Sequence, residues 1–413
     1  MTRLEQLICT LCPQGVEYKS LKELGCFFGG LSGKSKDDFT NGNAKFITYK
    51  NVYSNPALQI DVADKVKISA DEKQHSLQYG DVIFTGSSET PDECGFSSVV
   101  TIPTEEKLYL NSFCFFFRFN DSNIILPDFA KHLFRSSNLR WQIIRTASGV
   151  TRFNVSKRLM GDVIIPLPPL EVQQEIVRIL DQFTELTAEL TAELTARKEQ
   201  YKYYSLSLLN KANDTKRVPL SSLGTWCGGC TPSMANPAFW SNGKIPWVSS
   251  KDMKAPWLAD TQDHITQEAL TQTPIKLLPK NSVAIVARSG ILKHTLPVVF
   301  IPFETTVNQD IKALTVSQYV DPRYAYHIIN ANSSNILQKA KKQGGTVDSL
   351  DIQKFMNYLV PLPPLPEQRR IVSILDRFDA LCNDLTSGLP AEIEARRKQY
   401  EYYRDKLLTF KEL

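Results

Sequence analysis

The sequence lacks the features that mark a membrane-spanning or exported chain. No apolar run approaches the roughly 20 residues that a helix needs to cross a bilayer. The stretch Met1–Glu5 leads into a short amphipathic segment without a signal-peptide cleavage site. We therefore expect a soluble, cytoplasmic protein with no membrane partner, in which the 8 cysteines are reduced.

An excess of charge of one sign is also missing. The net charge is only +4 over 413 residues, and no large cluster of Lys and Arg occurs. This balance argues against a non-specific polycation but permits nucleic acid as a partner. The length predicts two to three domains, each large enough to bury its own core.

Residues that would carry catalysis are sparse. The 5 histidines are scattered without metal-ligand or triad spacing, and no pair of carboxylates stands in a suggestive frame. Asn55-Pro56 and Asn236-Pro237 resemble the start of the Asn-Pro-Pro-aromatic motif of amino-methyltransferases, but both lack the second proline. We predict that the chain is not an enzyme and carries no catalytic residue, cofactor or metal of its own.

The loop Gly29–Ser35 is the main alternative to a non-catalytic chain. It resembles a phosphate-binding loop, but only three residues separate Gly29 from Gly33 where the Walker pattern needs four. A nucleotide-driven enzyme that uses this loop is therefore kept as an alternative, and a Gly-rich turn is favoured.

Two cysteine pairs have metal-ligand spacing. Cys9-x-x-Cys12 and Cys227-x-x-Cys230 could supply four thiolates to a structural zinc ion. The pairs lie far apart in the sequence and at non-equivalent places in its two halves, so free thiols are the favoured interpretation.

The strongest pattern is a duplication. Pro166–Leu170 reads Pro-Leu-Pro-Pro-Leu, and the same five residues return as Pro361–Leu365. The residues that follow also return: Gln173, Ile176, Ile179, Asp181, Phe183, Arg197, Gln200, Tyr201, Tyr203 and Tyr204 are matched by Gln368, Ile371, Ile374, Asp376, Phe378, Arg396, Gln399, Tyr400, Tyr402 and Tyr403.

Each copy is predicted to form a long helix with an apolar seam. The seam residues follow coiled-coil steps of three and four, and they are Ile176, Ile179, Phe183, Leu186, Leu190, Leu194, Tyr201 and Tyr204 in the first copy and Ile371, Ile374, Phe378, Leu381, Tyr400 and Tyr403 in the second. An additional step of four, a stutter, coincides with the tandem repeats Thr187–Leu190 and Thr191–Leu194. Because neither helix buries its seam alone, we expect them to pair antiparallel. Gly388 and Pro390 should kink or break the second helix.

The helices bracket two dissimilar blocks that have the same order of parts. We predict an α+β protein with two mixed α/β domains at 26–165 and 218–360, helices at 166–217 and 361–413, and an N-terminal segment at 1–25 that completes the repeat. Expected strands in the first block are Lys45–Val52, Asp81–Thr85, Ser97–Ile102 and Phe113–Phe119, and one helix is expected over Asp128–Arg145 with Trp141 inward.

Polar and basic residues recur at equivalent places in the two blocks. Such side chains neutralise phosphates and bond base edges, so we predict a DNA-binding surface on each block. The candidates are Lys34, Lys36, Lys45, Tyr49, Lys50, Asn51, Ser87, Ser88, Thr151 and Arg152 in the first block and Ser249, Ser250, Lys251, Arg288, Ser289, Lys293, Lys341, Lys342 and Thr346 in the second.

This arrangement resembles the specificity subunits of Type I restriction–modification systems over essentially the whole chain. The resemblance rests on the doubled Pro-Leu-Pro-Pro-Leu helix, the doubled Arg-x-x-Gln-Tyr-x-Tyr-Tyr, the Thr-Ala-Glu-Leu repeats and Trp247-Val248-Ser249-Ser250-Lys251. It implies two target-recognition domains related by pseudo-two-fold symmetry and separated by two long antiparallel coiled-coil helices, each domain reading one half of a split site in double-stranded DNA.

The resemblance also implies partners. The helices would set the spacer between the half-sites and dock two modification (methyltransferase) subunits, and two restriction/translocase subunits would join them. S-adenosylmethionine, ATP and Mg would belong to those partner subunits. A coiled-coil scaffold without a role in DNA binding is the remaining alternative.

Overall fold

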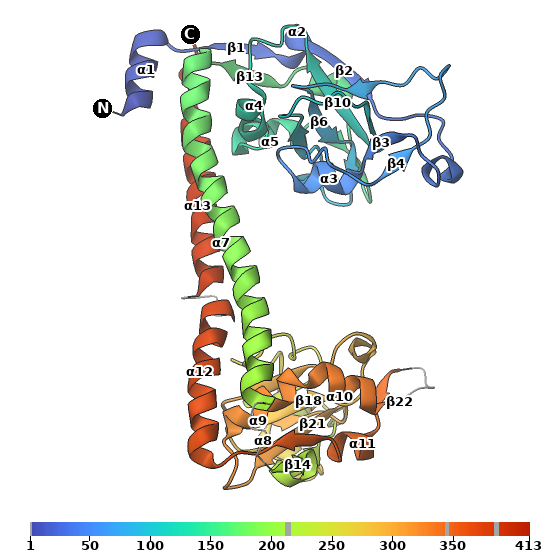
Figure 1. Ribbon diagram of the computed structural model, residues 1–413, viewed down its shortest axis with the longest axis vertical. Coiled ribbons are helices and arrows are strands. Elements are labelled where there is room, and N and C mark those ends of the chain that lie inside the picture. Colours follow the sequence, from blue (N-terminus) through green and yellow to red (C-terminus); the bar gives the residue numbers. More distant parts are fainter. Residues whose placement is uncertain (1, 211–215, 343–346, 384–387) are drawn as a thin grey trace. The chain divides into compact units, whose positions relative to one another are not determined.

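The computed structural model describes residues 2–210, 216–342, 347–383 and 388–413. The chain divides into two compact units, here called unit 1 (Met1–Leu190 with Ile393–Leu413) and unit 2 (Thr191–Glu392) (Figure 1). Each unit holds one mixed α/β block and parts of both helical repeats. The boundaries predicted for the blocks, 26–165 and 218–360, stay predictions. No described helix is long and apolar enough to span a membrane.

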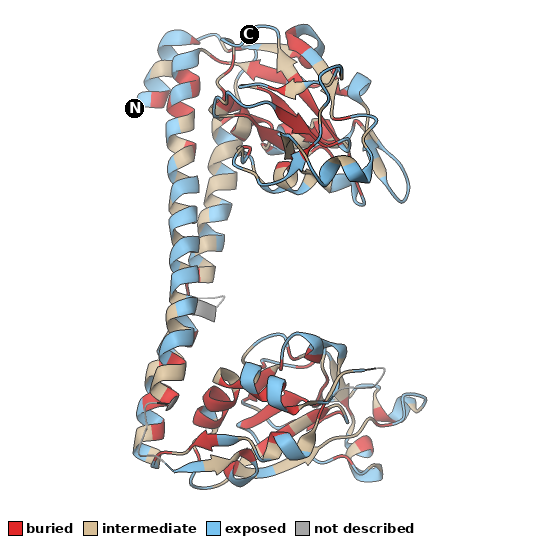
Figure 2. Ribbon diagram, turned by 45° about the vertical axis from the view of Figure 1, so that its right-hand side comes forward, coloured by how far each residue is buried: buried red, intermediate tan, exposed pale blue. Residues whose placement is uncertain are grey.

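Unit 1 is built on an antiparallel sheet with an apolar core. Its strand order is β2 (Gly25–Gly29), β10 (Cys114–Phe119), β6 (Val82–Thr85), β8 (Ser97–Val99). Phe84, Phe116 and Phe117 are fully buried in these strands, which Figure 2 shows as the buried centre of the unit. Three of the four predicted strands are therefore confirmed, with shorter bounds for β8.

A second sheet of unit 1 places the end of β3 beside the candidate site. Its order is β4 (Lys65–Val66), β3 (Ala44–Ile47), β9 (Leu108–Leu110), β5 (Ser76–Leu77), with β3 and β9 parallel. The predicted strand Lys45–Val52 is wrong beyond Ile47. The Thr48 hydroxyl accepts a hydrogen bond from the Asn51 amide and thereby caps helix α3 (Tyr49–Ser54).

A third, small sheet of unit 1 joins β7 (Ser87–Ser88), β12 (Phe153–Val155) and β11 (Ala147–Ser148).

Unit 2 repeats the pattern of unit 1. Its main sheet has the order β15 (Gly224–Gly228), β21 (Ile311–Val316), β18 (Ser282–Val286), β19 (Val298–Ile301), and a second sheet has β17 (Asp263–Ile265), β16 (Ile245–Val248), β20 (Thr306–Val307). The parallel pair β16 and β20 of unit 2 is equivalent to the parallel pair β3 and β9 of unit 1. The prediction of two modules with one fold is confirmed.

The helix predicted over Asp128–Arg145 is two helices, α4 (Pro127–Leu133) and α5 (Ser137–Ile144). The Ser136 hydroxyl donates to the Leu133 carbonyl, 2.7 Å away, and so binds a carbonyl at the end of α4. The break turns α5, so Trp141 is 59% exposed instead of inward. Unit 2 has the same break between α9 (Pro322–Ala331) and α10 (Ser333–Ala340).

The duplicated motif opens each long helix. Strand β13 (Ile164–Leu167) pairs with β1 (Glu17–Ser20), and β24 (Leu359–Pro361) pairs with β14 (Arg217–Pro219). The Gln173 amide then donates to two carbonyls, of Ile124 and Pro168, and accepts from the Leu126 amide. Gln368 makes the equivalent three bonds in unit 2. The matched glutamines fasten each helix start to its own block.

The repeat helices are α7 (Leu170–Asn210), α12 (Leu365–Asn383) and α13 (Leu389–Leu407). Phe183 in the first half of α7 stacks on Tyr403 of α13, whereas Tyr204 near its end stacks on Phe378 of α12. The reversed order means that the paired helices run antiparallel. Helix α13 begins anew at Leu389, with Pro390 in the first turn, where the missing amide hydrogen breaks no bond.

The seam is unevenly buried. Ile176 and Ile371, near the helix starts, are buried, while Tyr204 and Leu381 are exposed. The other predicted seam residues are half-buried, and they are Ile179, Phe183, Leu186, Leu190, Leu194, Tyr201, Ile374, Phe378, Tyr400 and Tyr403.

The remaining α-helices are α1 (Arg3–Leu11), α2 (Leu21–Leu24), α6 (Lys157–Met160), α8 (Gln267–Gln272) and α11 (Ile352–Met356), and the remaining strands are β22 (Lys341–Lys342) and β23 (Ser349–Leu350).

Candidate nucleic-acid interface

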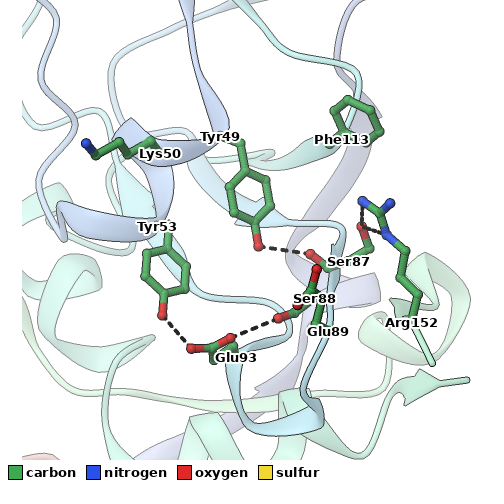
Figure 3. Close-up of a pocket in the computed structure, with 9 residues that line it drawn as sticks. All are labelled: Tyr49, Lys50, Tyr53, Ser87, Ser88, Glu89, Glu93, Phe113 and Arg152. Atoms are coloured by element: carbon green, nitrogen blue, oxygen red, sulfur yellow. Dashed lines mark hydrogen bonds between the residues drawn. The ribbon is translucent and has the colours of Figure 1, made fainter. Parts of the chain in front are cut away.

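A pocket of about 450 Å³ in unit 1 gathers half of the predicted residues of the first block (Figure 3). It lies where helix α3, strand β7 and the β11–β12 hairpin come together. Its lining includes the predicted residues Tyr49, Lys50, Ser87, Ser88 and Arg152. Segments far apart in the sequence thus form one polar and aromatic surface.

One wall of the pocket is a carboxylate held by hydroxyl groups. The Tyr53 hydroxyl donates to Glu93 Oε1 at 2.8 Å, and the Ser88 and Thr90 hydroxyls donate to Oε2 at 3.1 and 3.0 Å. These three hydrogen bonds lower the pKa of Glu93, and the bond from Tyr53 has the largest effect. The wall is therefore an ionised hydrogen-bond acceptor at neutral pH.

The opposite wall is cationic and apolar. Arg152 donates to the Ser87 hydroxyl from Nε (3.2 Å) and from Nη2 (3.0 Å), and its guanidinium lies 5.6 Å from the ring centre of Phe113. The Tyr49 hydroxyl donates to the Ser87 carbonyl at 2.9 Å. Phe113 is 58% exposed, so a large apolar ring is presented to a ligand beside a fixed cation.

The other predicted residues of the first block lie outside this pocket. The Lys34 side chain is 7% exposed and its ammonium binds Glu72 at 2.6 Å. Lys45 pairs with Glu106 at 3.0 Å, and the Asn51 side chain bonds the backbone of Gln59. These contacts occupy the three polar groups. Lys36 and Thr151 are exposed.

The structure does not support a phosphate-binding loop at Gly29–Ser35. Gly29 closes strand β2, and a Cβ on Gly30 would lie 2.0 Å from the Asn111 carbonyl oxygen. Gly30 is therefore required for close packing against the end of β9, whereas a Cβ on Gly29 would approach only the Lys157 ammonium, at 3.5 Å. The Lys34 ammonium, which would have to contact phosphates, is held by Glu72 and by the Lys67 carbonyl.

Unit 2 has an equivalent frame with different side chains. In unit 1 the Phe113 amide donates to Asn111 Oδ1, and the Phe113 carbonyl accepts from the Gly86 amide at 2.7 Å. In unit 2 the Asp310 amide donates to Asn308 Oδ1, and the Asp310 carbonyl accepts from Ala287 at 2.7 Å. Asp310 therefore occupies the place of Phe113.

The predicted residues Arg288 and Ser289 consequently take the places of Ser87 and Ser88. Arg288 Nε donates to Asp310 Oδ1 at 2.8 Å. The Ser289 amide donates to the carbonyl of Asp348, whose carboxylate lies 3.5 Å from the Lys341 ammonium. One continuous polar surface thus contains three of the predicted residues.

The remaining predicted residues of the second block are more dispersed. Ser249 is buried, and its hydroxyl donates to Asp252. Lys251, Lys293 and Lys342 are exposed, and Ser250 is half-buried. Thr346 lies outside the described residues.

Sequence reasoning missed Tyr53, Glu93, Phe113 and Asp310. Tyr53 had a detectable signal, because it stands four residues after Tyr49 and so shares its helix face. Glu93 ends the short 3-10 helix Pro91–Glu93, and Phe113 and Asp310 lie in turns. The positions of all three depend on pairing between distant strands, and no local pattern marks them.

The two cysteine pairs lie in different units, and within the described ranges no three His, Cys, Asp or Glu side chains are grouped to hold a metal ion. Burial raises the pKa of Cys12.

The chain matches the family model described as "Type I restriction modification DNA specificity domain" twice, over residues 13–200 and 213–395. It is 50% identical over 246 residues to the EcoR124I/EcoR124II specificity subunit of Escherichia coli, a match that spans 59% of this chain and 61% of that subunit. It is 35% identical over 276 residues to a putative type I restriction enzyme specificity subunit of Haemophilus influenzae, covering 64% of this chain and 68% of the relative.

Solved structures share the fold at low sequence identity. A chain from a type I R-M system matches with a TM-score of 0.64 and 17% identity over 96% of this chain and 98% of its own length. The S subunit of a Type-I restriction-modification system from M. genitalium matches with a TM-score of 0.52 and 12% identity over 95% and 96%.

Proposed function

The chain belongs to the Type I restriction modification DNA specificity domain family, and from this premise we propose that it is the sequence-reading subunit of such a system. Unit 1 binds one half of a bipartite site in double-stranded DNA, and unit 2 binds the other half. The chain itself performs no catalysis. The assembly acts on DNA in the cytoplasm.

The same proposal includes the partners. Two modification (methyltransferase) subunits dock on the repeat helices, and two restriction/translocase subunits complete the nuclease. S-adenosylmethionine, ATP and Mg²⁺ are bound by those partners. Exposed aromatic residues on the helices, such as Tyr203 and Tyr402, support a docking role.

One observation carries the proposal that the two units read different sequences. A shared frame of backbone hydrogen bonds presents Ser87 and Phe113 in unit 1 but Arg288 and Asp310 in unit 2. Base pairs are distinguished by the donors, acceptors and methyl groups at their edges. Identical frames with different donors and acceptors are therefore suited to two unlike half-sites.

The experiment is an exchange of recognition blocks. Residues 26–165 are replaced by the corresponding block of another family member, and methylated sites are mapped by sequencing in cells that contain the modification subunits. We expect one half-site to change while the other half-site and the spacer persist. A change in both half-sites would contradict the assignment of one half-site to each unit.

Two simpler assays address the alternatives. A coiled-coil scaffold would leave DNA unprotected when the chain and its modification subunits are footprinted together. A nucleotide-driven enzyme would require ATP binding by the purified chain, which the ion pair of Lys34 with Glu72 disfavours.

A further inference from the structure

Each unit holds an arginine beside two equivalent backbone positions, 87 and 113 in unit 1 and 288 and 310 in unit 2. The arginine comes from a different place in the chain in each unit. Ser87 and Arg288 are equivalent, because each follows the residue whose amide donates to Phe113 or Asp310. The β-pairing supports this equivalence. Ser87 is paired with Asn154 of the hairpin in unit 1, and Arg288 is paired with Ser349 in unit 2.

In unit 1 the guanidinium is supplied by the hairpin. Arg152 reaches across to the Ser87 hydroxyl through Nε and Nη2 and lies against Phe113. In unit 2 the strand position itself carries the arginine, and Arg288 Nε is held by Asp310. The Arg152 guanidinium therefore lies between positions 87 and 113 of unit 1. The Arg288 guanidinium lies between the equivalent positions 288 and 310 of unit 2.

Both arginines are anchored and still accessible. Nε is engaged by a hydroxyl in one unit and by a carboxylate in the other, which restricts the plane of the guanidinium. The Arg288 side chain is 60% exposed despite its ion pair, and Arg152 is also exposed. Arg288 is bonded to Asp310 through Nε, so its terminal amino groups can face a ligand. Arg152 also donates one Nη2 hydrogen to Ser87, which leaves Nη1 and the second hydrogen of Nη2 for a ligand.

We propose that Arg152 and Arg288 are the guanine-reading residues of the two half-sites, each bonding the O6 and N7 edge of one guanine in the major groove. The proposal rests on the function proposed above. Arginine forms this two-bond contact more often than any other specific contact to DNA bases.

The neighbouring carboxylates argue for a base contact and against a phosphate contact. Glu93 lines the same pocket as Arg152, and Asp310 bonds Arg288 directly. A phosphate approaching either arginine would be repelled by the carboxylate, whereas the amino group of the cytosine paired with guanine is a donor that a carboxylate accepts.

The test measures methylation by the complete assembly of this chain with its modification subunits. The substrates are a pool of duplexes that contain every single-base change of the recognised site. We expect Arg152→Ala to reduce the preference for guanine at one position of one half-site by roughly 10- to 100-fold, and Arg288→Ala to do so in the other half-site. Arg→Lys at either position keeps the charge but removes the planar fork, and it should lose most of the same preference.

Matched controls remove a charge of the same sign from elsewhere on each unit. Lys36→Ala and Lys293→Ala alter exposed lysines that lie outside the two frames. They should weaken binding to all sequences alike and leave the preference at each position unchanged.

The outcomes separate the inference from the proposed function. If the unmodified assembly shows no bipartite preference, the proposed function fails. A second outcome is that the unmodified assembly reads a bipartite site while Arg152→Ala and Arg288→Ala reduce methylation of all sequences evenly, or reduce the preference at a position that is not guanine. Either result would overturn the guanine assignment and leave the proposed function intact. The Arg→Lys variants preserve this distinction if either alanine variant unfolds, since they retain the ion pair or the packing at each position.

Discussion

The Tyr400 hydroxyl lies 2.8 Å from Nδ1 of His132, which joins the second repeat helix to the block of unit 1. Nε2 of the same ring lies 2.8 Å from Asp181 Oδ1, and Asp181 belongs to the first repeat helix. One buried histidine therefore connects the first recognition block to both copies of the duplicated helix.

Unit 2 contains the same arrangement with the copies exchanged. Nε2 of His327 lies 2.9 Å from Asp376 of the second copy, and Nδ1 lies 3.3 Å from the hydroxyl of Tyr201 of the first copy. Each block thus takes its aspartate from its own helix and its tyrosine from the other. This exchange requires both helices and explains why the two tyrosines recur in the duplicated sequence.

The protonation of the unit 1 contact follows from its surroundings. Burial lowers the pKa of His132 despite the opposing hydrogen bond with Asp181. Burial alone would raise the pKa of Asp181, but hydrogen bonds from His132 and Lys131 hold it below its usual range. The neutral imidazole therefore donates from Nε2 to the aspartate and accepts at Nδ1 from Tyr400.

Replacing Tyr400 by phenylalanine should destabilise unit 1. The change leaves buried Nδ1 of His132 without its donor, and an unsatisfied buried acceptor costs about 1–3 kcal/mol. Urea unfolding measures the change in the free energy of unfolding. Tyr402→Phe is the matched control, because Tyr402 is 62% exposed, and it should change that free energy by less than about 0.5 kcal/mol. Equal effects of the two variants would contradict the structural role of Tyr400.

Stability should fall as the pH is lowered below about 6.5, the ordinary pKa of histidine. Because the folded-state pKa of His132 is lowered, the unfolded chain binds a proton first, and the free energy of unfolding decreases with acidification. The slope contributed by this group is at most about 1.4 kcal/mol per pH unit. Thermal unfolding between pH 7.5 and 5.5 measures it. His132→Asn should flatten the dependence, whereas His294→Asn, at an exposed residue, should not.

Gly229 should not tolerate alanine. A Cβ at this position would lie 1.5 Å from the Val307 carbonyl oxygen, so strand β20 would have to move away from the loop. We expect a loss of about 3 kcal/mol in the free energy of unfolding of unit 2. Gly290→Ala is the control, since no atom lies within 4 Å of a Cβ there, and this change should be neutral or slightly stabilising. Equal stability of the two variants would show that the close approach is not required.

The sequence was informative where structure depends on local spacing. The long helices follow from apolar residues at steps of three and four, and the shared fold of the two blocks follows from the order of their parts. The helix break near Ser136 was missed, because the side chain of Ser136 competes with helix continuation only once its partner carbonyl is known. The pocket was only half predicted, since Glu93 and Phe113 are brought to Arg152 by strand pairing between distant segments.

The tandem repeats offer a direct test of the helix as a spacer. Thr191–Leu194 forms one step of four within α7, so its deletion removes about 6 Å of helix at 1.5 Å per residue. It also rotates everything that follows by about a tenth of a turn, since four residues slightly exceed one turn of 3.6. We expect a spacer shorter by one or two base pairs, because the rise of DNA is about 3.4 Å per base pair.

Methylome sequencing of cells with the deletion measures both half-sites and the gap between them. Both half-site sequences should persist, because the pocket of unit 1 and the frame of unit 2 contain no residue of this segment. A control with Thr191→Ser and Glu193→Gln alters the same segment at constant length and should leave the gap unchanged. A deletion that altered a half-site and preserved the gap would contradict the spacer role. In that case the helix would have to act on base reading itself, although neither Arg152 nor Arg288 belongs to it.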